Sequence, residues 1–344
     1  QEKRAEMDIK DIARLSSTSV ATVSRVLNND TKVSERTKLK VQAVIDQTGY
    51  KPNCVGRSLR RKRSKQLLIM LPTINNPFYS EIVVGFEQEA RANGYGVLVA
   101  VTHRNKDIEQ QYFELLFTRQ VDGVASFIPT ISHSKINEIA KQYPFVACCW
   151  RGGADIDASY VCIDNEKAAY DTVKFLIDVG HTKIAAMNGN YKERIYEQER
   201  ERGFYRALAD ADITIPKEYY IHCEYDFRAA YQATEKLMAL PSPPTAIFAM
   251  ADERAAGVIK FLNEHNYSVA VDVDVVGFDD TVISEITIPE ITTVAQPRLE
   301  IGREAVGLLI SQINNGNLPN KGIIMAHKLI ERGSTRKVDK QIKT

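Results

Sequence analysis

Residues 7–28 read MDIKDIARLSSTSVATVSRVLN and decide how the first part of the chain folds. Apolar residues recur with the i, i+3, i+4 spacing of a helix face on both sides of a polar break: Ile9, Ile12 and Ala13 before it, Val20, Val23 and Leu27 after it. Ser19 stands where the N-cap of the second helix belongs. Two short helices joined by a tight polar turn predict a helix-turn-helix.

The second of these helices is expected to direct small and polar residues outward at its start: Ser19, Ala21, Thr22, Ser24 and Arg25. A DNA-recognition helix needs such a surface, because its first turns approach base edges while hydroxyls and cations hold phosphates. We therefore predict a DNA-binding head. The alternative is a small helical bundle without a role on DNA.

Charge is distributed unevenly along the chain of 344 residues. Residues 1–64 hold 15 Lys and Arg against 7 Asp and Glu, a net charge of +8. Since the whole chain carries +1, the remainder carries −7. A basic head on an acidic body predicts one domain that meets a polyanion and one that does not.

A third helix is predicted to begin near Val33 and to end at Gly49, with Pro52 preventing its continuation. Four cations lie on or before its early turns, where some should touch phosphate and the rest should be solvated: Lys32, Arg36, Lys38 and Lys40. The basic segment 53–64, NCVGRSLRRKRS, follows with one large apolar residue, Leu59. A plain linker would give Leu59 no role, whereas a short DNA-contacting helix would wedge it into the minor groove.

Motifs of the head follow one another as in the LacI family of bacterial repressors, which the chain resembles over essentially its whole length: SVATVSRVLN (19–28), VSERTKLKV (33–41), GYKPN (49–53) and GRSLRR (56–61). Two motifs of the body look most like the cytidine-repressor branch of that family: TTVAQPRLEIGREAVGLL (292–309) and LIERGSTR (329–336). Gly56 stands where the family usually has Ala, so the hinge helix is expected to form only on DNA or to tolerate looser half-site spacing.

This resemblance implies a set of DNA contacts in the recognition helix and in the hinge helix: Ser19, Val20, Ala21, Thr22, Ser24, Arg25 and Asn28, then Arg57, Ser58, Leu59 and Arg60. In the family pattern, Val20 and Ala21 contact bases. Leu59 pairs with its counterpart in the other subunit and kinks the centre of a palindromic operator.

From Lys65 onward, short apolar runs alternate with amphipathic segments, beginning with QLLIMLP (66–72) and the helix expected over 77–93. This alternation predicts parallel sheets flanked by helices. Two similar α/β halves predict a bilobed body with a cleft at the carboxyl ends of the strands. The resemblance implies the same body, like that of a periplasmic sugar-binding protein.

The expected domains are a helix-turn-helix head over residues 1–52, a hinge helix over 53–64, and an effector-binding and dimerisation body over 65–344. Within the body, we assign roughly 65–163 and 280–296 to one lobe. The other lobe is expected to hold 164–279 and 297–344.

Ten side chains near the predicted strand ends resemble the effector-contacting positions of the family: Phe78, Tyr79, Trp150, Arg151, Arg194, Tyr196, Arg200, Tyr225, Asp279 and Gln296. Arg and Asp side chains grip paired hydroxyls, and aromatic rings cover sugar faces or stack on bases. Arg200 and Asp279 are expected to form the hydroxyl clamp. The predicted effector is a small hydroxylated molecule, a sugar slightly favoured over a nucleoside.

Some of these positions have other interpretations. Phe78 could belong to the core, Trp150 could pack at the lobe interface, and Arg194 could be solvated. Asp252 is expected to cap its helix. Ala251 stands where many sugar-binding relatives carry Asn or Ser, which removes one partner for a hydroxyl.

The sequence offers no enzyme, metal or cofactor signal. GxSxG, HExxH, P-loop and GxGxxG motifs are absent, the six His are scattered, and the five Cys include no CxxC pair. No apolar run could span a bilayer and no signal-peptide core is visible, so we expect a cytoplasmic protein. The rival from another class is a solute-binding protein that feeds a transporter, against which the basic head argues.

A homodimer is expected, since one short recognition helix reads too few bases and a two-fold dimer matches a palindrome. Its interface is predicted near residues 77–93. The polar tail without leucine heptads favours a dimer over a tetramer. Effector binding would re-angle the lobes, change the spacing of the two hinges and so alter operator affinity.

Overall fold

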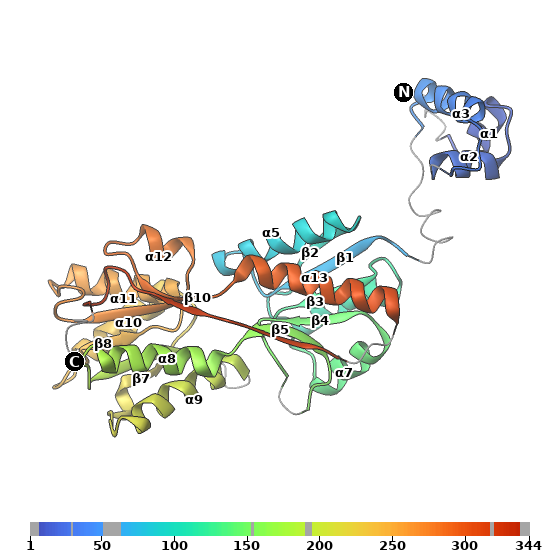
Figure 1. Ribbon diagram of the computed structural model, residues 1–344. Coiled ribbons are helices and arrows are strands. Elements are labelled where there is room, and N and C mark those ends of the chain that lie inside the picture. The colour runs from blue at the N-terminus through green and yellow to red at the C-terminus, as the bar shows by residue number, and fades with distance from the viewer. Residues whose placement is uncertain are drawn as a thin grey trace, which may run out of the picture. The chain divides into compact units, whose positions relative to one another are not determined.

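The computed structural model describes residues 7–28, 30–50, 63–152, 155–189, 195–316 and 320–337. The chain divides into two compact units, Gln1–Ser64 and Lys65–Thr344 (Figure 1). The described part of the first unit is helical, and the second unit holds two mainly parallel sheets. The predicted combination of an α-helical head and a two-lobed α/β body is confirmed.

The head contains α1 (Ile9–Leu15), α2 (Val20–Leu27) and α3 (Glu35–Thr48). Each helix begins at a side chain that accepts hydrogen bonds from backbone N–H groups of the first turn: Asp8, Ser19 and Ser34. Gly49, with φ of 65°, ends α3 in the left-handed conformation that favours glycine. The three helices share a small core of buried side chains: Ile12, Ala13, Val23, Val26, Val33 and Val41.

The first lobe of the body begins with eight elements in chain order: β1 (Gln66–Leu71), α5 (Pro77–Ala92), β2 (Gly96–Val101), α6 (Lys106–Phe117), β3 (Gly123–Ser126), α7 (His133–Gln142), β4 (Phe145–Cys148) and β5 (Ser159–Ile163). Two later elements complete it, α13 (Arg298–Asn315) and β11 (Gly322–Met325). The six parallel strands run in the order β11-β5-β4-β3-β1-β2. Helices α5 and α13 pack on one face, and α6 and α7 on the other.

The second lobe has a similar plan: α8 (Asn165–Asp178), β6 (Ile184–Asn188), α9 (Ile195–Asp210), a 3-10 turn (Lys217–Tyr219), β7 (Tyr220–His222), α10 (Phe227–Met238), β8 (Ala246–Phe248), α11 (Asp252–Glu264), β9 (Asp274–Asp279), α12 (Val282–Ile286), β10 (Thr292–Ala295) and β12 (Lys328–Ile330). Its strand order is β12-β10-β9-β8-β6-β7, with β12 antiparallel to β10. Helices α8 and α9 cover one face, and α10 and α11 cover the other.

The expected division of the last third of the chain between the lobes is wrong. Strand β10, within the segment 280–296, pairs with β9 in the second sheet and not in the first. Conversely, α13 packs against α5, and β11 pairs with β5 in the first lobe. The chain therefore crosses between lobes after β5, after β10 and after β11 (Figure 1).

Two glycines allow α5 and α13 to approach closely. A Cβ at Gly85 would lie 2.0 Å from the carbonyl oxygen of Leu299, and one at Gly302 would lie 2.1 Å from that of Ile82. These helices lie side by side in Figure 1. Their backbones touch where any larger residue would push them apart.

Gly302→Ala should therefore destabilise the body by about 1–3 kcal/mol, the usual range for forced overpacking. Gly307→Ala in the same helix is the matched control, because a Cβ there meets nothing within 4 Å. The control should be neutral or stabilising by up to ~1 kcal/mol, since Ala is the better helix former. Urea unfolding followed by circular dichroism measures both, and equal stabilities would contradict the close approach.

Candidate functional site

The recognition helix α2 buries Val23 and Val26 and turns the opposite face outward. Ser19, Ala21, Arg25 and Asn28 are exposed, and Val20, Thr22 and Ser24 are half-buried. The Ser19 hydroxyl accepts from the backbone N–H of Thr22 and also lies 2.9 Å from the Thr22 hydroxyl. Val20 packs against the core of the head, and the contacts of these side chains with DNA stay a prediction.

The other expected DNA contacts divide between described and undescribed residues. Arg36 and Lys40 on α3 are exposed, as is Lys32 ahead of it, while the Lys38 ammonium lies 2.7 Å from Glu35. Arg57, Ser58, Leu59 and Arg60 lie outside the described residues, as do Gly56 and most of the hinge helix expected over 53–64, of which only residues 63 and 64 are described.

One pocket in the body, with about 670 Å³ of empty space, brings together seven of the ten side chains expected to bind an effector: Phe78, Tyr79, Tyr196, Arg200, Tyr225, Asp279 and Gln296. Phe78 and Tyr79 come from the start of α5 in the first lobe, and the others come from α9 and from strand ends of the second lobe or the segment after β10. The pocket thus lies between the lobes.

Arg200 is held in place by fixed partners. Its Nε donates to Oδ1 of Asn165 at 3.0 Å, and its Nη1 donates to the Met250 carbonyl at 2.9 Å. Its guanidinium lies 3.6 Å from the centre of the Phe278 ring, on which it stacks. The remaining nitrogen, Nη2, lies 3.9 Å from Oδ1 of Asp279. At this distance, a ligand hydroxyl between the two groups can accept a hydrogen bond from Arg200 and donate one to Asp279.

Asp279 ends β9 with φ of 107°, which is unusual for a residue other than glycine. The Gln296 amide donates to its Oδ1 at 2.7 Å, and Arg298 Nη1 donates to its carbonyl oxygen and to that of Asp280. Burial raises the pKa of the Asp279 carboxyl, and the nearby Arg200 charge partly opposes that rise. Burial also raises the pKa of the Tyr79 and Tyr225 phenols, so both rings present neutral hydroxyls.

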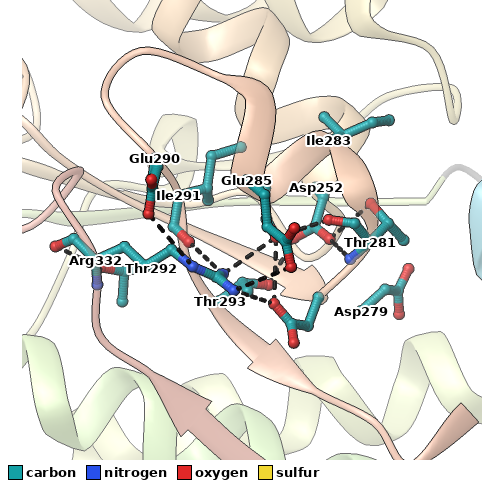
Figure 2. A network of polar contacts seen from close by, with 12 residues as sticks. Asp252, Asp279, Thr281, Ile283, Glu285, Glu290, Ile291, Thr292, Thr293 and Arg332 are labelled. Atoms are coloured by element: carbon teal, nitrogen blue, oxygen red, sulfur yellow. Dashed lines mark hydrogen bonds and ion pairs between the residues drawn. The ribbon is translucent and has the colours of Figure 1, made fainter.

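A second polar network supports the turn that follows Asp279 (Figure 2). Arg332 Nη2 lies 2.8 Å from Oδ1 of Asp280, and its Nη1 donates to the Ile291 carbonyl at 3.0 Å and to the Ser284 hydroxyl at 3.1 Å. Arg332, which follows β12, therefore fixes the loop between β9 and β10.

Asp252 does not cap its helix as expected. Ala251 is the N-cap of α11 and offers no side-chain bond, whereas the buried Asp252 carboxylate accepts from Thr281 N at 2.6 Å, Thr281 Oγ1 at 2.9 Å and Thr293 Oγ1 at 2.5 Å (Figure 2). Burial and the neighbouring Asp279 charge raise its pKa to about 7. Asp252 thus ties α11 to β10 beneath the pocket.

Two expected effector contacts, Trp150 and Arg151, do not line this pocket. Trp150 packs in the first-lobe core that α6 and α7 cover, with its Nε1 donating to the Ser126 carbonyl at 3.0 Å. Arg151 Nε lies 2.7 Å from Oε1 of Glu199, whose other oxygen accepts from Asn165 at 3.4 Å. Arg151 therefore acts on Arg200 only through these two residues. Arg194 lies outside the described residues.

The pocket also contains side chains that the sequence did not single out: Thr73, Asn76, Arg104, Phe127, Ile128, Cys149, Asn188, Glu197, Met250 and Arg254. Several follow or end a strand, as Phe127 follows β3, Asn188 ends β6 and Met250 follows β8. The rule that ligands bind at strand carboxyl ends could have found these. Nothing in the sequence pattern distinguished Arg254, a cation in a largely apolar helix.

The cysteines carry no site of their own. Cys148, Cys149, Cys162 and Cys223 are free thiols, and burial raises the pKa of Cys162 to about 12. Cys148 and Cys162 are buried as expected, while Cys149 is half-buried at the pocket wall, and Cys54 lies outside the described residues. Across the described ranges, no three His, Cys, Asp or Glu side chains gather as metal ligands would, and no helix is long and apolar enough to span a membrane.

A helix-turn-helix head joined to a two-lobed body with a pocket between its lobes defines a ligand-responsive DNA-binding regulator. The profile of the bacterial regulatory proteins of the lacI family matches residues 8–53, and that of the periplasmic binding protein-like domain matches residues 173–335. The chain is 33% identical to catabolite control protein A of Priestia megaterium over 95% of this chain and 99% of that one. It is 34% identical to the HTH-type transcriptional repressor CytR of Escherichia coli K12 over 98% of both.

Solved structures agree with this assignment. The lac repressor dimer bound to operator and the anti-inducer ONPF has the same fold, with a TM-score of 0.87 at 23% identity over 97% of this chain and 100% of that one. The complex of the transcriptional regulator CelR with cellobiose gives a TM-score of 0.71 at 26% identity over 95% and 99%. The chain belongs to the lacI family of DNA-binding transcriptional repressors, which are not enzymes.

The raised pKa of Asp252 predicts how stability changes with pH. Because the folded state binds this proton more tightly than the unfolded chain, the contribution of Asp252 to stability is full below pH 4 and is lost as pH rises through about 7. Asp252→Asn should remove this loss, which amounts to up to ~1.4 kcal/mol per pH unit.

Urea midpoints between pH 4 and 8 for wild type, Asp252→Asn and the exposed control Asp178→Asn measure the effect. Wild type and control should fall more steeply with pH than Asp252→Asn. Parallel profiles for all three proteins would show that Asp252 titrates as an ordinary carboxyl.

Proposed function

We propose that this repressor binds a palindromic operator as a homodimer, and that a small hydroxylated effector between Arg200 and Asp279 changes its operator affinity. The observation that carries the proposal is the fixed Arg200–Asp279 pair in a pocket lined from both lobes. A ligand that contacts both lobes binds one lobe arrangement better than another, which is the requirement for regulation.

A sugar is the favoured effector. The pocket offers a cation, a carboxylate and the Asn76 and Asn188 amides for hydroxyls. The similarity to the CelR complex with cellobiose and to the ribose operon repressor of Escherichia coli, 32% identical, supports a sugar. The Phe78 and Tyr225 rings in the same pocket favour a nucleoside as the second candidate, because aromatic faces stack on bases.

The homodimer is proposed to form near α5, where the sequence predicted the interface. Val84 on α5 is exposed, and so are Leu98 and Val99 on β2, which is an edge strand of the first sheet. Exposed apolar residues on an unpaired edge support a covering partner. In the hinge segment, Leu59 is proposed to wedge into the centre of the operator, held by Arg57, Ser58 and Arg60 at the backbone.

Arg25→Ala should weaken DNA binding and reduce the salt slope of log K by about 1, the effect of losing one phosphate contact. Arg228→Ala on α10, an exposed arginine in the second lobe, is the matched control and should leave the slope unchanged. Fluorescence anisotropy with a selected duplex between 50 and 200 mM salt measures both. Binding that does not respond to salt would favour a solute-binding protein without a role on DNA.

Arg200→Ala should abolish the response to effector while Arg202→Ala, on the exposed face of the same helix, preserves it. A thermal-melting panel of sugars and nucleosides identifies the effector, because a ligand at a hundred times its Kd adds ~2.7 kcal/mol of stability. Adding that effector to the operator-binding assay then reveals whether it releases or tightens DNA. A response that survives in Arg200→Ala would rule out the proposed clamp.

A further inference from the structure

Arg254 differs from the other arginines in and around the pocket. Its Nε donates to the Glu224 carbonyl at 3.3 Å and its Nη2 to the Cys223 carbonyl at 3.2 Å. Its guanidinium also interacts with the Cys223 thiol and lies 5.2 Å from the centre of the Tyr225 ring. Its Nη1 donates to no oxygen or nitrogen of the described chain, and no described carboxylate lies within 4.0 Å of the guanidinium. The side chain is 3% exposed and lines the pocket.

The neighbouring arginines have carboxylate partners. Arg200 faces Asp279, Arg298 pairs with Glu81 at 2.5 Å, and Arg332 pairs with Asp280 at 2.8 Å. Burying a guanidinium costs several kcal/mol, of the order expected for any desolvated charge, unless an opposite charge compensates for it. Two neutral carbonyls compensate only in part. The fold therefore holds a cation at the pocket wall without an opposite charge beside it.

The start of α11 adds positive potential at the same wall. Met250 lines the pocket directly before the helix, and the N-cap Ala251 supplies no side-chain acceptor for the first N–H groups. The nearest candidate acceptor, the Asp252 carboxylate, bonds instead to Thr281 and Thr293. This 13-residue helix starts without a side-chain cap next to the buried arginine, although Asp252 and Glu253 in its first turn already place negative charge there.

More cations than carboxylates line the pocket. Three guanidinium groups line it, from Arg104, Arg200 and Arg254, against two carboxylates, from Glu197 and Asp279. Asp279 accepts from Gln296 and faces Arg200, so its charge and that of Glu253 act on Arg254 only from beyond 4.0 Å. The pocket keeps a net positive charge that a neutral sugar or nucleoside would leave unpaired.

We propose that the effector carries an acidic group, a carboxylate or a phosphate, which Nη1 of Arg254 binds while Arg200 and Asp279 hold its hydroxyls. The two anchored nitrogens fix the guanidinium, so the third donor meets the anion without further ordering. The inference rests on the proposed effector function and specifies the chemical class of its ligand.

The test compares matched neutral and acidic compounds by thermal melting of the full chain at constant ionic strength. The pairs are D-ribose with D-ribose 5-phosphate, D-glucose with D-gluconate and with D-glucose 6-phosphate, and cytidine with cytidine monophosphate; inorganic phosphate and acetate serve as the minimal anions. At least one acidic member should raise the Tm at a concentration at least tenfold lower than its neutral parent requires. The phosphate and carboxylate arms identify which acid is bound.

Arg254→Gln keeps donors for the two carbonyls but removes the charge, and should abolish this preference. Arg202→Gln, an exposed arginine on α9, is the control and should retain it. Both variants and wild type have the same basic head, so any anion binding by the head contributes equally to all three proteins and cancels in this comparison. Arg254→Lys keeps the charge and should retain a weaker preference.

Failure of every acidic probe to stabilise wild type more than its neutral parent would overturn the proposal, and this comparison needs no variant. An acid preference that persists unchanged in Arg254→Gln would overturn it as well. DNA binding measured on the same preparations distinguishes a failure of the acidic-effector proposal from a failure of the proposed regulatory function. If DNA binding and a neutral effector response are intact, the acidic class alone has failed; if both are lost, the regulatory function has failed.

Discussion

The pocket depends on the bonds that Arg298 makes to the turn after β9. Its Nη1 donates to the carbonyl oxygens of Asp279 and Asp280, whose φ angles of 107° and 54° are costly for residues other than glycine. Bonds from a charged donor offset that cost. The same guanidinium pairs with Glu81 on α5, so one side chain connects the effector-facing carboxylate of the second lobe to a helix of the first.

This connection gives the lobes a physical means of coupling. A ligand that pulls on Asp279 also pulls on Arg298, and through Glu81 on the face of α5 that neighbours the proposed subunit interface. Arg332 resists from the other side by holding Asp280 (Figure 2). A turn clamped between two cations is better suited to transmit a displacement than to absorb it, since neither side can relax alone.

Local patterns in the sequence were enough to predict the head and the succession of strands and helices, whereas the expectation that Arg200 and Asp279 lie together came from the family resemblance. The patterns could not predict which sheet a strand joins. The apolar pattern of β10 is the same in either lobe, and only its pairing with β9 places it in the second sheet. Trp150 and Asp252 were misread for a related reason. A strand-end tryptophan can face either side of the sheet, and an acidic residue at a helix start can bond outside its helix, as Asp252 does to Thr281 and Thr293.

The repeated crossing of the chain has a consequence for biosynthesis. Strand β11 completes the first sheet and β12 the second, and both come from the segment 322–330. On the ribosome, therefore, each lobe lacks one strand until residues 322–330 have emerged. The head precedes both lobes in the chain and folds from local contacts before them. A nascent chain thus acquires its DNA-reading part before either lobe of its effector-binding part is complete.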